Sequence, residues 1–325
     1  MKALLNWLVE DGEPMPWRSV AVTTAAVAGP ALVAVPLIGS PGAIAFMAGL
    51  SAHLAARDRG IGPAAVVTLV LMMSGLLVLG APVMALILAP CLAVMIGIGG
   101  TRGMAQPGMR ALIVWTIFTS PILPDDRDAL LAAIFIGGMI WALAITWWFE
   151  EDATGDGETA QSHRYALIFG VGLGIGLMLS VYVGGRYFGE HGFWFPLTFV
   201  VLCVPPHGNL FSKTLRRTLG TVLGTAIAIA VAAISEEMWL TVAVGMIALP
   251  VAFRFLPRNY TLFTTFLTVA VLEILALVSQ VSVLAVERLV TMAAAAAMTV
   301  VLGVLGIIVL RLVKPDALRA LQSGE

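Results

Sequence analysis

The chain has 325 residues, of which 60% are hydrophobic and 11% are charged, and its formal net charge is −1. Its mean hydropathy is +0.99. A soluble domain has about 25% charged residues, so this chain has too little polar surface to cover a soluble core. The composition therefore predicts an integral membrane protein and excludes a nucleic-acid-binding protein, a disordered chain and a disulfide-bonded scaffold.

Apolar stretches of roughly the length that a helix needs to cross a bilayer, about 20 residues, occur twelve times along the chain. In order they cover residues 18–38, 41–56, 61–79, 82–99, 108–120, 128–149, 164–184, 192–206, 214–234, 238–254, 259–279 and 283–312. Barrel strands would alternate apolar and polar residues, which these stretches do not. The sequence therefore predicts an all-α integral membrane protein with about twelve transmembrane helices.

The placement of basic residues predicts the orientation in the membrane. With the N-terminus in the cytoplasm, all but three of the 18 Lys and Arg residues fall on the cytoplasmic side, the three being Arg127, Arg186 and Arg288. Lys and Arg gather in the cytoplasmic loops of membrane proteins. We therefore expect both termini to be cytoplasmic.

The longest polar stretch, residues 150–163, divides the predicted helices into two sets of six. Each set begins on the same side, so two parallel six-helix repeats are expected, in residues 1–149 and 164–325, joined by a cytoplasmic linker. Unusually short spans at 41–56 and 192–206 occupy matching positions in the two halves. Such spans point to a central site, but local thinning of the bilayer explains them equally well.

A dense run of motif residues lies between positions 191 and 224. It contains Trp followed by Pro-Leu-Thr, then a Pro-x-x-Gly turn, then an Arg-x-x-Gly-Thr-x-x-Gly helix. The motif residues are Trp194, Pro196, Leu197, Thr198, Pro205, Gly208, Arg217, Gly220, Thr221 and Gly224. This pattern resembles the fusaric-acid-resistance-like (FUSC) and aromatic acid exporter superfamily, with the chain as a compact, membrane-only member.

The resemblance implies efflux of small aromatic or amphipathic organic acids across a bacterial inner membrane, with a periplasmic adaptor protein as a partner. Two alternatives remain: a passive organic-anion channel, as in distantly similar plant malate channels, and a non-transporting membrane scaffold. A homo-oligomer is also left open. The sequence has no His-Glu-x-x-His, Gly-x-Ser-x-Gly or Walker A motif. We therefore expect no enzyme, no cofactor and no metal, and an ion gradient rather than ATP as the energy source.

The candidate substrate residues come from the motif region. Arg217 starts a predicted helix on the cytoplasmic side, where its charge would attract an anionic substrate, or where it only anchors the helix. Gly220 and Gly224 lie on one face, which lets a partner helix approach closely. Thr221 lies between them, and the resemblance adds Trp194 and Thr198 to the translocation path.

A break in helical structure is expected at Pro205 to Asn209, because proline removes backbone donors and glycine favours a turn. If this segment lines a water-filled cavity, His207 and Asn209 face the substrate and His207 titrates near neutral pH. The alternative is a solvated loop. Trp115 and Trp141 fall inside predicted spans, where they either stack on an aromatic substrate or pack in the protein.

Glu273 is the clearest acid inside a predicted span, roughly 21 Å from the start of its helix at 1.5 Å per residue. A carboxylate there should be protonated, paired or exposed to a cavity, because an unpaired charge in the membrane is costly. Arg288, near the start of the last span, is its expected partner. Either Glu273 couples transport to protons, or the two side chains form a fixed ion pair between helices.

Overall fold

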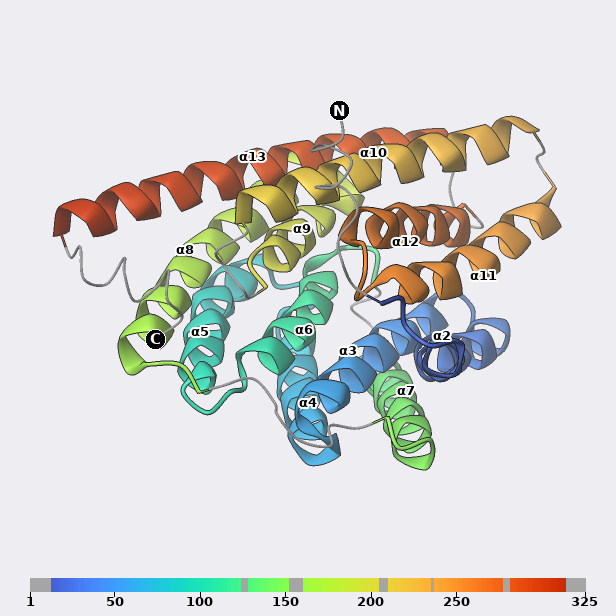
Figure 1. Cartoon of the computed structure of the whole chain (residues 1–325), viewed down its shortest axis with the longest axis horizontal. Coiled ribbons are helices and arrows are strands. Elements are labelled where there is room, and N and C mark those ends of the chain that lie inside the picture. The colour runs from blue at the N-terminus through green and yellow to red at the C-terminus, as the bar shows by residue number, and fades with distance from the viewer. Residues whose placement is uncertain are drawn as a thin grey trace. The chain divides into compact units, whose positions relative to one another are not determined.

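The computed structural model describes six stretches of the chain. They are residues 13–123, 128–151, 160–204, 210–234, 237–276 and 281–313. Within them the chain forms twelve α-helices, three short 3₁₀ helices and no strand (Figure 1). The α-helices are α2 (Trp17–Ile38), α3 (Ile44–Arg59), α4 (Ile61–Leu76), α5 (Pro82–Gly100), α6 (Ala105–Trp115), α7 (Asp128–Trp148), α8 (His163–Tyr187), α9 (Trp194–Leu202), α10 (Leu210–Ile234), α11 (Met238–Phe255), α12 (Tyr260–Leu275) and α13 (Val281–Val313). The all-α class is confirmed, and each predicted stretch overlaps one helix.

Six of the described helices are long and apolar enough to cross a membrane: α2, α5, α7, α8, α10 and α13. Three more, α4, α11 and α12, are apolar but shorter. The twelve predicted helices are therefore present in the described residues, and six of them have the length and composition of a full span. That all twelve cross the membrane stays a prediction. The arrangement in two parallel six-helix repeats is not confirmed and stays a prediction.

The remaining helices are α3, α6 and α9, and each of them adjoins a short 3₁₀ helix. The 3₁₀ helix η1 (Ser40–Ala43) precedes α3, where Pro41 cannot donate a backbone hydrogen bond. Helix α6 passes into η2 (Thr116–Thr119), and α9 has nine residues and follows η3 (Gly189–His191). Each of these three apolar stretches therefore consists of a short α-helix with a 3₁₀ turn before or after it, and not of one long α-helix.

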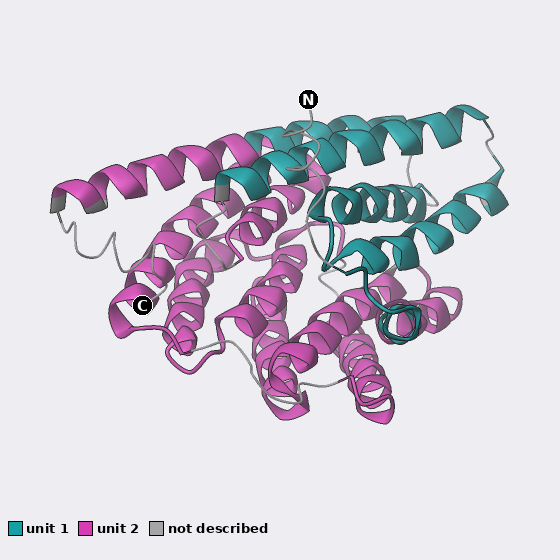
Figure 2. Ribbon diagram, viewed as in Figure 1, with its two compact units in different colours: residues 1–24, 211–294 teal, residues 25–210, 295–325 magenta. Residues whose placement is uncertain are grey.

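Contacts divide the chain into two compact units, at places other than the predicted linker (Figure 2). Unit 1 contains Met1–Thr24 and Phe211–Ala294, and unit 2 contains Ala25–Leu210 and Ala295–Glu325. Helices α2 and α13 contribute residues to both units. Residues 152–159 of the predicted linker lie outside the described part of the chain, so the division of the sequence into two halves and a linker stays a prediction.

Unit 2 is held together by close contacts between helix backbones. Helix α5 packs against α8, and α3 packs against α4, α6 and α7. A Cβ added to Gly97 would lie 2.5 Å from the carbonyl oxygen of Ala166, and one added to Gly138 would lie 2.8 Å from that of Ala45. Small residues at helix contacts are the usual device of membrane bundles, where lipid removes the hydrophobic drive for association.

Unit 1 contains α11 packed against α12, together with most of α10 and the first part of α13. The N-terminal segment joins the end of α11. The backbone N–H of Met15 donates a hydrogen bond to the carbonyl oxygen of Arg254 at 3.0 Å. The guanidinium of Arg254 lies 5.0 Å from the ring centre of Trp17, a cation–π contact.

Candidate functional site

The inward face of α10 carries a polar column. Arg217, Thr221 and Thr225 are spaced by four residues, so they share one face of the helix, and all three are buried. Val222 and Leu223 on another face are exposed, as expected for side chains in contact with lipid. Helix α10 therefore has its polar face inside and its apolar face outside, the reverse of a helix on the surface of a soluble protein.

The glycine pair of the motif brings α10 against α12. A Cβ added to Gly220 would lie 2.6 Å from the carbonyl oxygen of Thr261, and Gly224 faces the carbonyl oxygen of Thr265 in the same way. Any larger residue would push the two backbones apart. The close approach expected from the Gly-x-x-x-Gly spacing is therefore present, and α12 is the partner helix.

Arg217 lies at this contact, and not all of its N–H donors have an acceptor among the described residues. Its Nη1 donates to the hydroxyl of Tyr260 at 3.2 Å. Its Nε is buried and has no hydrogen-bond partner within the described residues. The ammonium of Lys213, one turn earlier on α10, lies 5.9 Å from the ring centre of Tyr260. This end of α10 thus holds two positive charges beside one phenol.

Arg288 belongs to the same unit and lies near Arg217. It is buried on α13, and the like charge of Arg217 acts on it. One turn further along, the hydroxyl of Thr218 contacts the sulfur of Met292 at 3.7 Å, which places this part of α13 beside α10. Two buried guanidinium groups therefore lie within electrostatic range of each other in the interior of unit 1.

Glu273 is not paired with Arg288. The Glu273 side chain is 1% exposed, and neither carboxylate oxygen has a hydrogen-bond partner among the residues that the structure describes. It lies at the contact with α11, where a Cβ added to Gly245 would be 3.4 Å from the Glu273 Cβ. The expected interhelical ion pair is therefore not formed.

Threonine hydroxyls add neutral hydrogen-bonding capacity to unit 1. The hydroxyls of Thr221, Thr225, Thr261 and Thr264 are all buried, and none has a hydrogen-bond partner within the described stretches. Buried polar groups normally have partners, so this set is an exception that a bound molecule would resolve. The sequence analysis missed all of these except Thr221, although the run of threonines between positions 261 and 268 was a usable signal.

The other predicted site residues lie in unit 2 or outside the description. Trp115 and Thr198 are fully buried, and neither Trp115 Nε1 nor Thr198 Oγ1 has a hydrogen-bond partner in the described chain. Trp194 is buried, with its ring centre 5.1 Å from that of the His191 ring. The short helices α3 and α9 both pack against α6, which carries Trp115.

His207 and Asn209 lie outside the described residues, so their expected place at a cavity is not tested.

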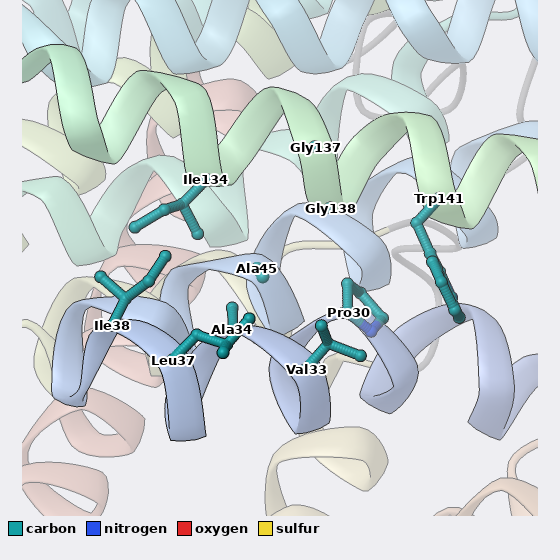
Figure 3. A pocket seen from close by; sticks show the side chains of 10 residues that line it. All are labelled: Pro30, Val33, Ala34, Leu37, Ile38, Ala45, Ile134, Gly137, Gly138 and Trp141. Atoms are coloured by element: carbon teal, nitrogen blue, oxygen red, sulfur yellow. The ribbon is translucent and has the colours of Figure 1, made fainter.

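Trp141 lies apart from that buried group, on a groove between α2 and α7 (Figure 3). The groove has a volume of about 250 Å³, and its wall is formed by Pro30, Val33, Ala34, Leu37, Ile38, Ala45, Ile134, Gly137, Gly138 and Trp141. Trp141 Nε1 donates to the carbonyl oxygen of Ala25 at 3.0 Å. The wall contains no charged side chain, so this groove cannot by itself neutralise a carboxylate.

No three His, Cys, Asp or Glu side chains gather as metal ligands would in the part of the chain that the structure describes. No curated protein and no solved structure matches the chain. Residues 171–302 match the family described as fusaric acid resistance protein-like. The matched region includes Arg217, Glu273 and Arg288, and it confirms the resemblance seen in residues 191–224. The match and the apolar helices support a membrane transport or efflux role, and residues 171–302 of the chain are similar to the fusaric acid resistance protein-like family.

Proposed function

We propose that the protein is a secondary exporter of small aromatic or amphipathic organic acids, coupled to protons, in a bacterial inner membrane with both termini cytoplasmic. The family match supports transport. The observation that carries the choice of an anionic substrate is the pair of buried guanidinium groups of Arg217 and Arg288 in unit 1.

The substrate carboxylate would bind at this pair. Burying two like charges side by side is costly in a membrane protein, and an anion between them supplies an opposite charge through charge-assisted hydrogen bonds. The unpartnered Nε of Arg217 and the hydroxyls of Thr221 and Thr225 are available donors. Because they belong to one helix face, a single carboxylate can contact several of them.

Glu273 would couple this binding to protons. A buried carboxyl group without a hydrogen-bond partner is stable only in its neutral, protonated form. It can lose its proton only when its surroundings change. Exchange of its proton would therefore accompany a conformational change in unit 1. Glu273 acts without a fixed ion pair to Arg288 in this proposal.

The remaining candidates would extend the path for the apolar part of the substrate. Trp115, Trp194 and Thr198 are buried aromatic and hydroxyl side chains in unit 2, and Trp141 lines the apolar groove. His207 and Asn209 keep their proposed place at a turn facing the path. A periplasmic adaptor and assembly into a homo-oligomer are part of the same proposal.

The test is transport by the purified protein in liposomes, with labelled benzoate as the probe and an imposed pH gradient. We expect Arg217→Gln to lower the initial rate about 30-fold or more, because a hydrogen-bonded charge is lost. Arg216→Gln is the matched control, since Arg216 is the neighbouring residue outside the motif face, and it should keep most of the rate.

The same assay separates the alternatives. Accumulation against the benzoate gradient, beyond that in protein-free liposomes under the same pH gradient, supports the exporter, because neutral benzoic acid crosses lipid by itself. Movement that only follows the benzoate gradient, unchanged by pH, would favour a passive organic-anion channel. No movement of any small organic acid, from a protein that remains folded in the liposome, would favour a scaffold.

A further inference from the structure

A second buried polar cluster lies in unit 2 and takes no part in the proposed substrate site. Its centre is His53 on α3, which is fully buried and flanked by the fully buried Ala52, Ala55 and Ala56. An imidazole among alanines, inside a chain this apolar, is the kind of ionisable group that is rare unless it is used.

The hydrogen bonds around His53 determine which ring nitrogen carries its proton. Nδ1 of His53 lies 2.8 Å from the hydroxyl oxygen of Thr146, and that hydroxyl lies 2.6 Å from the carbonyl oxygen of Ala142. A carbonyl oxygen can only accept, so the single hydroxyl proton of Thr146 is donated to Ala142. Nδ1 of His53 must therefore donate to Thr146, and Nε2 is the nitrogen that can take up a further proton.

Charged side chains surround this ring. Arg110 on α6 pairs with Asp58 on α3, with Nε to Oδ2 at 2.6 Å and Nη2 to Oδ1 at 2.9 Å. Arg57 on α3 lies 3.7 Å from Glu151, just after α7. The positive charges of Arg57 and Arg110 both act on His53.

Among the described residues, the other elements packed against α3 bring no further acid into an ion pair with these groups. Helix α4 contains no charged residue and meets α3 through the hydroxyls of Ser51 and Thr68, 3.2 Å apart. Arg59 donates from Nε to the carbonyl oxygen of Gly103 at 2.9 Å and from Nη2 to that of Arg102 at 2.5 Å. With a neutral imidazole, the charges of Arg57 and Arg110 are balanced by those of Glu151 and Asp58. A proton on the ring leaves one positive charge unbalanced.

We propose that His53 is a proton-binding switch. When its ring is protonated, it destabilises the packing of α3 against α6 and α7. A proton from solvent adds to Nε2, and the ring becomes a cation under the influence of the positive charges of Arg57 and Arg110. The packed arrangement holds the neutral ring, and an arrangement with α3 loosened holds the protonated one. Acidification therefore shifts the balance toward the loosened arrangement. This inference does not rest on transport, because its readouts are local accessibility and stability.

The size of the effect follows from linkage. An unperturbed histidine takes up its proton near pH 6.5, so a shift to pH 5 favours the loosened arrangement about 30-fold if the packed one binds no proton. A histidine that only packs, with the same hydrogen bond to Thr146, predicts no such dependence on pH.

The first measurement is the thermal unfolding midpoint of the full-length protein in detergent, at pH 8 and pH 5. His53→Asn is the test variant, because its amide can still donate to Thr146 but cannot take up a proton. His163→Asn is the control, because His163 is exposed at the start of α8. We expect the wild type and His163→Asn to lose about 5 °C or more on acidification, and His53→Asn to lose less than half as much.

The second measurement keeps the test valid if His53→Asn does not fold. Ala56→Cys, at a fully buried position, is made in a chain that carries Cys91→Ser and Cys203→Ser, because Cys91 is exposed and would also be labelled. The labelling rate is divided by that of a free thiol at each pH. We expect the ratio to rise about 30-fold from pH 8 to pH 5. An unchanged ratio, or an equal loss of stability in His53→Asn and wild type, would overturn the proposal.

Discussion

Unit 1 and the polar cluster around His53 in unit 2, called the α3 cluster below, both bury polar side chains. The two regions differ in whether those side chains have hydrogen-bond partners. In the α3 cluster, Ser51 is bonded to Thr68, His53 to Thr146, and Arg110 to Asp58. In unit 1, the carboxylate of Glu273 and the hydroxyl of Thr221 have no hydrogen-bond partner among the described residues. Paired buried groups hold helices together, whereas unpaired ones reserve hydrogen bonds for something that binds or moves.

The largest effect is expected at the close backbone contact between α10 and α12 in unit 1. Gly220→Leu should destabilise the protein by about 3 kcal/mol or prevent folding, because the side chain would enter the backbone of α12. Thermal unfolding and the yield of folded protein measure this. The control is Gly172→Leu on α8, where an added Cβ meets no atom within 4 Å. Equal tolerance of both substitutions would show that α10 and α12 are not in contact.

A smaller loss is expected when the paired acid of unit 2 is neutralised. Asp58→Asn removes the charge that balances Arg110 and should lower the free energy of unfolding by about 2 kcal/mol, less than for full burial because both side chains are partly exposed. A double-mutant cycle with Arg110→Gln isolates the pair. Additive losses in that cycle would mean that the two side chains do not interact.

Neutralising Glu273 in unit 1 should leave the free energy of unfolding within about 0.5 kcal/mol of the wild-type value, because Glu273→Gln breaks no hydrogen bond among the described residues. Under the proposed function it should also abolish transport driven by a pH gradient while substrate still binds. Vesicle transport and thermal unfolding measure the two parts. Loss of stability equal to that of Asp58→Asn would restore the interpretation of Glu273 as a structural ion-pair partner, and full gradient-driven transport would end its coupling role.

The smallest expected difference compares two buried threonines. Thr68→Val removes the partner of Ser51 and should cost about 1 kcal/mol of stability. Thr221→Val removes a hydroxyl without a partner among the described residues, so stability should hold, while the affinity for benzoate should fall about fivefold. Calorimetry and unfolding of the same two variants give both numbers. Reversed results would remove the distinction between the two regions.

Helical structure was predictable from the sequence because hydropathy and helix breakers act over one segment at a time. The stretch 82–99 became α5 (Pro82–Gly100), and 128–149 became α7 (Asp128–Trp148), each with a shift of one residue at its C-terminal end. The motif around Arg217 and Gly220 also indicated the family, because its residues lie close together in the chain. The sequence did not indicate which apolar stretches would form full-length helices, because the turn at η1 and the 3₁₀ extension of α6 shorten helices without changing their composition.

The sequence by itself determined the membrane environment, the twelve helices and the glycine face of α10, since each depends on composition or on spacing within one helix. Only the tertiary structure decided which polar groups meet. It placed Arg288 near Arg217 and left Glu273 against α11, and it brought His53 to Thr146, 93 residues away in the chain. Contacts between helices depend on depth and rotation, and a change of one residue in register turns a side chain by about 100°, which no pattern within a single helix records.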